Sequence, residues 1–392
     1  MVMQLLMLLI LAATACPVSH AQANTPPPSA SDVRFAFGGN AAEIPAQFIG
    51  NLVFVPLRVN ESQPSLFVLD STAPVSSVDP ERAAELGLTP GLGVLLELAG
   101  VQMRLPGLPA AARKNFAAEV GRPYEGALGQ DFLGKIVVEL DYARHTVRLY
   151  DPADYQYAGH GAILPLTFSG GMPVVPVKFT SASGKKLEAN FVVDTTLDAS
   201  VVISGRYAKA HGLHAPHVRA TTAGESGEGE EDFALARLKL FEMGGYDVSA
   251  PVTEFTAPDS HADDDPQVAG RIGGGMLRRF TVVFDYSRRR MILEGNVNFR
   301  EDDVGDMSGI SLLAGGPGLK RLEVVAVRRG GPGASAGIQP SDIIAGIDDE
   351  PAADLSLAEV RALFREPGRQ HKLLLERHGQ TITVTLRLRR LL

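Results

Sequence analysis

Two aspartates, Asp70 and Asp194, each end an apolar run and are followed by residues that carry hydroxyl groups. Two carboxylates held a few ångströms apart share one proton, because two like charges at that distance cannot both ionise. Such a pair supplies a base that activates water and an acid that protonates a carbonyl oxygen, so it can hydrolyse a peptide bond without a metal. A single Asp after a strand usually closes a turn, so the repetition is the informative feature.

The sequence around these two aspartates is duplicated. Each apolar run is followed by a short predicted helix, at residues 80–88 and 204–213, which stops at a glycine as helices commonly do. Residues 126–142 and 270–286 align without a gap, and both stretches end in Asp-Tyr. The aligned stretches lie 144 residues apart and the aspartates 124, so the second copy carries about 20 extra residues. We expect two related lobes, with the insertion in the acidic loops 225–232 and 259–265.

This ordered set of motifs, present twice over residues 35–298, resembles the bacterial retropepsin-like aspartic proteases, relatives of pepsin. The resemblance implies two tandem β-barrel lobes, at residues 35–155 and 156–298, which form a unit with pseudo-two-fold symmetry. It also implies that Asp70 and Asp194 are the catalytic dyad at the interface of the lobes. Because one chain supplies both aspartates, we expect a monomer.

The resemblance also assigns supporting roles to four residues beside the aspartates. Ser71 and Thr195 would hydrogen-bond across the interface and hold the two aspartate loops rigid. Gly129 and Gly273 would let the closing strand of each lobe pass beside its aspartate loop, because glycine has no Cβ.

The sequence departs from the family at the third residue of each catalytic motif. The family has Asp-Thr-Gly, whereas this chain has Thr72 and Thr196 in place of the glycine. Threonine is β-branched, disfavours positive φ and adds bulk near the shared water. The sequence therefore leaves two functions open: an active aspartic-type endopeptidase, or a catalytically disabled protease fold that binds polypeptides.

Residues 305–392 resemble a bacterial PDZ domain, a module that binds an extended peptide by adding it to a sheet edge. We predict residues 322–327 as the edge strand, 357–364 as the facing helix and 315–319 as the carboxylate-binding loop. Pro317 weakens the last assignment, since it lacks an N–H donor. A PDZ domain that only shields or dimerises the protease is the alternative. The predicted peptide-binding residues are Gly318, Leu319, Leu322, Val324 and Leu357.

The N-terminus indicates export. Residues 1–23 read as a secretory signal peptide that ends in Ala-Gln-Ala, and residues 24–34 as a Pro/Ser linker. The apolar run at residues 5–15 is too short to span a bilayer. Cys16 is the only cysteine, so the exported chain has no disulfide bond. We expect a periplasmic or secreted protein, with lipidation at Cys16 and membrane attachment as the minority alternative.

The rest of the composition fits a mainly β chain and narrows the partners. Short apolar runs broken by Gly, Pro and Asn fill residues 33–257, which is typical of β structure. The net charge is −8 with no basic stripe, so nucleic acid is not an expected partner. His211, His214 and His217 have a loose metal-ligand spacing but lack cysteine partners, so no metal or other cofactor is predicted. The expected partner is a polypeptide substrate.

Overall fold

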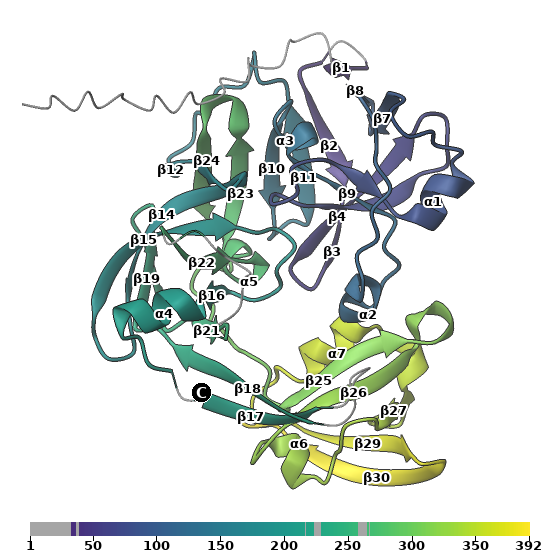
Figure 1. Cartoon of the computed structure of the whole chain (residues 1–392), viewed down its shortest axis with the longest axis vertical. Coiled ribbons are helices and arrows are strands. Elements are labelled where there is room, and N and C mark those ends of the chain that lie inside the picture. Colours follow the sequence, from purple (N-terminus) through teal and green to yellow (C-terminus); the bar gives the residue numbers. More distant parts are fainter. Residues whose placement is uncertain (1–32, 37–38, 216, 223–228, 258–264, 266) are drawn as a thin grey trace, which may run out of the picture.

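The computed structural model describes residues 33–36, 39–215, 217–222, 229–257, 265 and 267–392. The predicted signal peptide, Cys16 and nearly all of the predicted linker lie outside these residues, as do most of the two predicted acidic insertions. Three units follow one another along the chain: two β lobes and a C-terminal domain beneath them (Figure 1). No helix in the described part is long and apolar enough to cross a membrane.

A six-stranded antiparallel sheet joins the two lobes. At its centre β10 (Val137–Asp141) pairs with β23 (Phe280–Asp285), the two strands that carry the duplicated Asp-Tyr motif. The order on either side is symmetric, with β11 (Thr146–Tyr150) and β2 (Ala41–Pro45) on one flank and β24 (Arg290–Gly295) and β12 (Ala162–Pro165) on the other. The duplication therefore builds a pseudo-two-fold unit around a shared sheet, and one apolar core runs through both lobes.

Each lobe places its aspartate at the end of a central strand. In lobe 1, β5 (Ser65–Leu69) pairs antiparallel with β4 (Leu52–Val59) and parallel with β9 (Gly126–Leu128). In lobe 2, β15 (Lys186–Val193) pairs in the same way with β14 (Met172–Thr180) and β22 (Val268–Ile272). The other elements of lobe 1 are β1 (Val33–Phe35), β3 (Gln47–Ile49), β6 (Ser77–Val78), α1 (Pro80–Glu85), β7 (Val94–Leu98), β8 (Val101–Leu105), α2 (Phe116–Val120) and α3 (Gln130–Leu133).

Lobe 2 contains an extra hairpin that lobe 1 lacks. Strands β17 (His217–Thr222) and β18 (Gly229–Arg237) lie between the helix α4 (Gly205–His211) and the hairpin of β19 (Leu240–Met243) and β20 (Tyr246–Ser249). Of the predicted insertion at residues 225–232, the described residues 229–232 lie at the start of β18. Its strand β17 pairs with β26 of the C-terminal domain, so the sheet of lobe 2 continues into that domain. The other elements of lobe 2 are β13 (Thr167–Ser169), β16 (Val201–Ile203), β21 (Val252–Phe255) and α5 (Gly274–Leu277).

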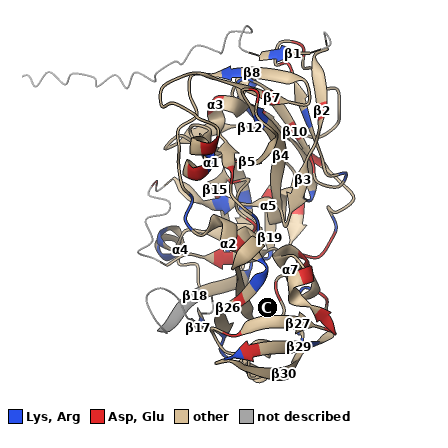
Figure 2. Cartoon of the chain, turned by 90° about the vertical axis from the view of Figure 1, so that its right-hand side faces the viewer, with Lys and Arg blue, Asp and Glu red and all other residues tan. Residues whose placement is uncertain are grey.

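The C-terminal domain has its own apolar core and the elements expected of a PDZ domain. The core is closed by the helix α7 (Leu357–Leu363), which begins with a capping box at Ser356 and Glu359. The other elements are β25 (Ile310–Gly315), β26 (Arg321–Arg328), α6 (Pro332–Ser335), β27 (Ile343–Ile347), β28 (Glu350–Pro351), β29 (Gln370–Arg377) and β30 (Gln380–Arg387). Acidic and basic segments are interspersed over all three units in Figure 2.

The predicted edge strand of this domain is wrong. Strand β26 pairs with β25 on one side and with β27 and β17 on the other, and Leu322 and Val324 are fully buried. Gly318 and Leu319 lie in a short 3-10 turn between β25 and β26. The edge strand is β25, which pairs only with β26 among the described strands. The predicted helix is correct, although Leu357 is buried in the domain core.

Ser341 gives a stability prediction for this domain. Its φ is +68°, in the left-handed region that L-residues avoid, while its side chain is exposed. We expect Ser341→Gly to raise the free energy of unfolding by about 0.5–1 kcal/mol, because glycine adopts this backbone without steric cost. Ser311→Gly in the extended strand β25 is the control and should lower stability instead. Urea unfolding of both variants decides the sign.

Candidate active site

The two aspartate loops are joined by hydrogen bonds across the lobe interface. The Ser71 amide donates to Thr195 Oγ1 over 3.0 Å, and the Thr195 amide donates to Ser71 Oγ over 3.1 Å. Each hydroxyl also donates to the opposite strand, Ser71 to the Val193 carbonyl at 2.7 Å and Thr195 to the Leu69 carbonyl at 2.6 Å. The predicted cross-interface bonds are therefore present. They place Asp70 and Asp194, each one residue earlier, at the same interface.

Each aspartate has one oxygen held by its own loop. Asp70 Oδ1 accepts hydrogen bonds from the Thr72 amide at 2.9 Å, the Thr72 hydroxyl at 2.7 Å and the Ala73 amide at 3.0 Å. Asp194 Oδ1 accepts from the Thr196 amide at 3.0 Å and its hydroxyl at 2.9 Å. Both carboxylates are about 95% buried. This arrangement fixes one oxygen of each carboxylate and leaves Oδ2 to face other groups.

The two threonines are accommodated without backbone strain. Neither Thr72 nor Thr196 appears among the described residues with positive φ, although the sequence raised that concern. Their hydroxyls instead turn back onto the neighbouring aspartates and add a hydrogen bond to each Oδ1. The glycine that the family has at this position is thus replaced by a residue that helps to hold the carboxylate.

Gly129 and Gly273 lie where a side chain has no room. A Cβ on Gly129 would come within 2.7 Å of the Ala73 carbonyl oxygen, and a Cβ on Gly273 within 2.3 Å of the Ala199 carbonyl oxygen. Both contacts are with the loop that follows each aspartate. Backbone atoms cannot move aside cheaply, so only glycine fits at these two positions.

An arginine occupies the second oxygen of each aspartate. Arg113 Nη1 lies 3.1 Å from Asp70 Oδ2, and Arg271 Nη1 lies 3.0 Å from Asp194 Oδ2. Arg113 Nη2 also reaches Thr196 Oγ1 at 3.4 Å, so this guanidinium bridges the two aspartate loops. Arg271 projects from the core strand β22, whereas Arg113 precedes α2 and stacks on the Phe116 ring, 4.7 Å from its centroid. Neither arginine belongs to the sequence motifs that indicate the aspartate pair.

Burial and the negative charge of Asp70 raise the pKa of two nearby tyrosines, Tyr286 and Tyr124. Burial raises the pKa of the Tyr286 phenol, and the negative charge of Asp70 raises it further. Burial likewise raises the pKa of Tyr124, against a hydrogen bond with Ser77 and the positive charge of Arg113, which lower it. Both phenols therefore stay protonated at ordinary pH. Tyr286 comes from the predicted Asp-Tyr motif of lobe 2.

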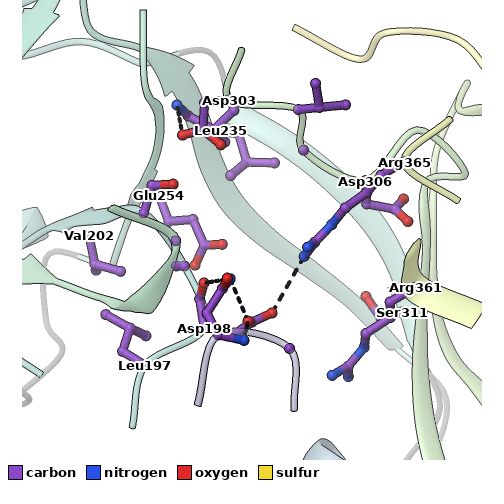
Figure 3. A pocket seen from close by; sticks show the side chains of 18 of the residues that line it. Leu197, Asp198, Val202, Leu235, Glu254, Asp303, Asp306, Ser311, Arg361 and Arg365 are labelled. Carbon is purple, nitrogen blue, oxygen red and sulfur yellow. Dashed lines mark hydrogen bonds and ion pairs between the residues drawn. The ribbon is translucent and has the colours of Figure 1, made fainter. Parts of the chain in front are cut away.

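Asp198 ties three parts of the molecule together. Its Oδ1 accepts hydrogen bonds from the Asn51 amide at 3.0 Å and from Asn51 Nδ2 at 2.8 Å, so it joins lobe 2 to lobe 1. Its Oδ2 lies 3.4 Å from Arg365 Nη2 of the PDZ domain (Figure 3). Asp198 follows Asp194 by four residues, so the loop of the second aspartate contacts both the other lobe and the PDZ domain.

A cavity of about 1310 Å³ lies between the lobes and the PDZ domain, and neither Asp70 nor Asp194 is among its lining residues. Its lining includes Arg113 and Thr196 at the aspartates, Val202 and Leu235 of lobe 2, and Arg361 of the PDZ helix α7. Figure 3 shows the polar side chains of Asp198, Arg361 and Arg365 turned into this space. The cavity therefore runs from Arg113 and Thr196, which contact the aspartates, to the PDZ domain, and it offers room for a polypeptide segment.

The histidines proposed as a weak metal motif do not gather as ligands in the described residues. The His211 ring stacks on Tyr207 with centroids 3.9 Å apart, and its Nδ1 lies 3.0 Å from the Tyr207 carbonyl oxygen. No group of three metal-binding side chains was found in the part of the chain that the structure describes.

The cross-interface bonds give a second stability prediction. Thr195 is 2% exposed, and removing its hydroxyl leaves the Ser71 N–H and the Leu69 carbonyl without a partner. An unpaired buried group costs about 1–3 kcal/mol, so we expect Thr195→Val to lower the free energy of unfolding by about 2–4 kcal/mol. Thr167→Val, on an exposed strand position of the same lobe, should change it by less than about 0.5 kcal/mol. Urea unfolding of the two variants compares them directly.

Comparison with known proteins supports the class of the C-terminal unit. The family model for the PDZ domain matches residues 323–377. An aspartic proteinase from Irpex lacteus is similar in structure, with 14% identity, 67% of this chain and 99% of that chain covered, and a TM-score of 0.39.

Two further solved structures share shorter stretches. An aminopeptidase N family protein from Idiomarina loihiensis has 20% identity over 23% of this chain and 15% of its own, with a TM-score of 0.20. A photosystem II D1 C-terminal processing protease has 23% identity over 25% of this chain and 26% of its own, with a TM-score of 0.22. No curated protein matches the sequence.

The fold and the site together define the class of this protein. Two duplicated β lobes share one sheet and bring one aspartate each to their interface. A PDZ domain follows them and packs against both. The protein is therefore mainly β, with two duplicated lobes that share one sheet and a C-terminal PDZ domain.

Proposed function

We propose that this protein is an exported aspartic-type endopeptidase that is latent in the conformation described here. The observation that supports the proposal is the reciprocal hydrogen bonding of Ser71 and Thr195, which joins the loops of Asp70 and Asp194 across the lobe interface. The cavity that begins at Arg113 and Thr196 supplies space for a polypeptide. The PDZ domain adds a surface that takes extended peptide.

The chemistry follows from the paired carboxylates. One carboxylate removes a proton from water, whose oxygen attacks the peptide carbonyl carbon, while the other carboxyl group donates its proton to the carbonyl oxygen. The tetrahedral intermediate then breaks at the C–N bond. The leaving nitrogen takes up the proton that the first carboxylate took from water, and a hydroxyl group of the intermediate returns its proton to the second carboxylate. The loop hydrogen bonds to each Oδ1 hold both carboxylates in place during these steps.

The arginines explain why this conformation is latent. A water that uses both carboxylates needs their free oxygens, and both Oδ2 atoms accept bonds from guanidinium groups instead. Each guanidinium therefore lies where the shared water or the substrate carbonyl would have to contact that oxygen. Arg113 lies on a surface segment, so its withdrawal would free Asp70 Oδ2. The Asp194 carboxylate has further acceptor positions for the water beside its bond to Arg271.

The second candidate function is a non-catalytic polypeptide-binding protein on the same fold. Arg271 favours it, because this residue projects from the central strand β22 and cannot leave Asp194 by a loop movement. The two candidates differ in one measurable property, the hydrolysis of peptide bonds.

A cleavage assay separates the two candidates. The purified chain is incubated with a peptide library from mild acid to neutral pH, with and without a statine-type inhibitor. The endopeptidase proposal predicts internal cleavage that the inhibitor blocks. Analytical ultracentrifugation of the active fraction should find a monomer, because one chain contains both aspartates. Activity confined to a dimer would contradict the one-chain site.

Export is part of the proposal and has its own test. The signal-like N-terminus motivates it, and we expect the exported chain to begin near Asn24. Mass spectrometry of the protein from the extracytoplasmic fraction gives the start directly. A diacylated start at Cys16 would place the protein on a membrane surface, and an intact Met1 would contradict export.

A further inference from the structure

The peptide-binding groove of the PDZ domain is covered by lobe 1. The groove lies between the edge strand β25 and the helix α7, which contact each other. Helix α2 of lobe 1 packs on β25, and Figure 1 shows it directly above α7. A Cβ on Gly121, at the end of α2, would come within 2.7 Å of Leu357 Cβ on α7. The end of α2 therefore presses on the helix that a bound peptide would face.

Arg361 of α7 fastens this closed arrangement. Its Nη1 donates to the Glu119 carbonyl of α2 over 2.7 Å, and its Nη2 donates to the Leu312 carbonyl of β25 over 3.2 Å. The Leu312 carbonyl lies on the edge strand to which an added peptide strand would bind. One side chain thus holds α2 in place and occupies an acceptor of the groove.

The segment that covers the groove also carries Arg113. Residues 113–121 run from the guanidinium on Asp70 to the glycine against α7. A second arginine near the end of α7, Arg365, pairs with Asp198 in the loop of the other aspartate. The PDZ helix therefore contacts the loop of Asp194 and the segment that blocks Asp70.

The start of β25 indicates which kind of peptide fits. Asp306 Oδ1 accepts hydrogen bonds from the Ser308 amide at 2.9 Å, the Gly309 amide at 2.8 Å and the Ser308 hydroxyl at 2.7 Å. Backbone amides of this kind are the donors that capture a terminal carboxylate. Because an internal carboxylate already occupies them, the groove suits an internal extended segment rather than a free C-terminus.

We propose that residues 113–121 act as a displaceable cover of the PDZ groove, and that an extended internal peptide segment bound along β25 displaces this cover and withdraws Arg113 from Asp70. The groove and the aspartate pair are then two sites joined by one segment. A polypeptide that occupies the first site opens the second. The displacement stands on its own, whereas its effect on peptide hydrolysis rests on the proposed endopeptidase function.

Gly121→Leu tests the displacement from the lobe 1 side. The new side chain meets Leu357 and pushes α2 away, while every PDZ residue stays unchanged. Gly91→Leu is the matched control, because Gly91 has a similar φ of +79° against +74° and nothing within 4 Å of a built Cβ. The probe is a display library of twelve-residue peptides presented internally, selected on full-length Gly121→Leu protein.

The expected result is a gain of binding. A selected peptide should bind Gly121→Leu at least about tenfold more tightly than wild type, because the open groove no longer pays for displacing α2. Gly91→Leu should match wild type. Equal affinity for all three proteins would overturn the proposal, and so would the absence of any binder from the library.

Hydrogen exchange of the wild-type protein tests the coupling without any use of activity. The Glu119 and Gly121 amides donate to carbonyls within the segment, over 2.8 Å each. Saturating peptide should speed the exchange of residues 113–121 severalfold. Peptide bound with unchanged exchange would contradict the coupling. Faster exchange without peptide hydrolysis would defeat the endopeptidase proposal and leave this inference standing.

Discussion

The substitution Asp70→Asn or Asp194→Asn is expected to lower the rate of peptide hydrolysis by about 10²–10⁴-fold, the range that a positioned acid or base contributes. In both variants the amide oxygen still accepts the loop hydrogen bonds that now reach Oδ1, whereas Asp194→Asn also loses the ion pair with Arg271. It removes the proton donor or acceptor on the other oxygen. The double variant should be no worse than either single one, since the two groups act as a unit.

The measurement for this prediction uses the Arg113→Met background, where Asp70 is free of its arginine. Initial rates of peptide cleavage are compared with those of Asp247→Asn, an exposed position on β20 that should leave the rate unchanged. If the single asparagine variants cleave as fast as their parent, the activity belongs to another protein and the assignment of the dyad fails.

The substitution Arg113→Met is expected to raise the rate of peptide hydrolysis at least about tenfold. Methionine keeps an unbranched apolar side chain near Phe116 and removes the guanidinium from Asp70 Oδ2 and from Thr196 Oγ1. Tenfold corresponds to about 1.4 kcal/mol, a modest part of what an ion pair at a buried carboxylate can supply.

Lys114→Met controls for the loss of one positive charge on the same segment, because Lys114 is exposed. Its rate should match that of wild type. If Arg113→Met hydrolyses peptide as slowly as wild type while Asp70→Asn still binds peptide, Arg113 does not inhibit the site. The non-catalytic polypeptide-binding function is then favoured, because Arg271 remains on Asp194.

The sequence predicted the centre of the site well because duplication repeats the chemistry. Asp70 and Asp194 stood in matching contexts, and the resemblance assigned Ser71 and Thr195 to the bonds that the structure places between the lobes. The two threonines do not adopt the positive φ that the family's glycine suggested, and their hydroxyls donate to the adjacent aspartates.

The two arginines differ in how far the sequence could have revealed them. Arg271 aligns with Ala127 in the gapless repeat, so a charge in an apolar strand beside an aspartate was a visible signal. For Arg113 the sequence contains no comparable signal, since many exposed loops carry an arginine. Its place at Asp70 depends on how α2 packs against Phe54 and Tyr124 in lobe 1, which is tertiary information.

The wrong edge strand of the PDZ domain has a similar physical cause. Strands β25 and β26 both alternate buried and less buried residues, and both read as short apolar runs. Alternation shows which face of a strand is buried, but it does not show whether the strand has a neighbour on one side or on two. The pairing of β17 with β26 adds a neighbour from another domain, which a local pattern cannot indicate.

Binding of a statine-containing peptide, measured by calorimetry, tests most directly that Asp70 and Asp194 form one site that Arg113 closes. The hydroxyl of statine takes the place of the attacking water, so its affinity reports on both carboxylates without any turnover. The account predicts tighter binding to Arg113→Met than to wild type, and loss of that gain when Asp194→Asn is added. Equal affinity for all three proteins would contradict it.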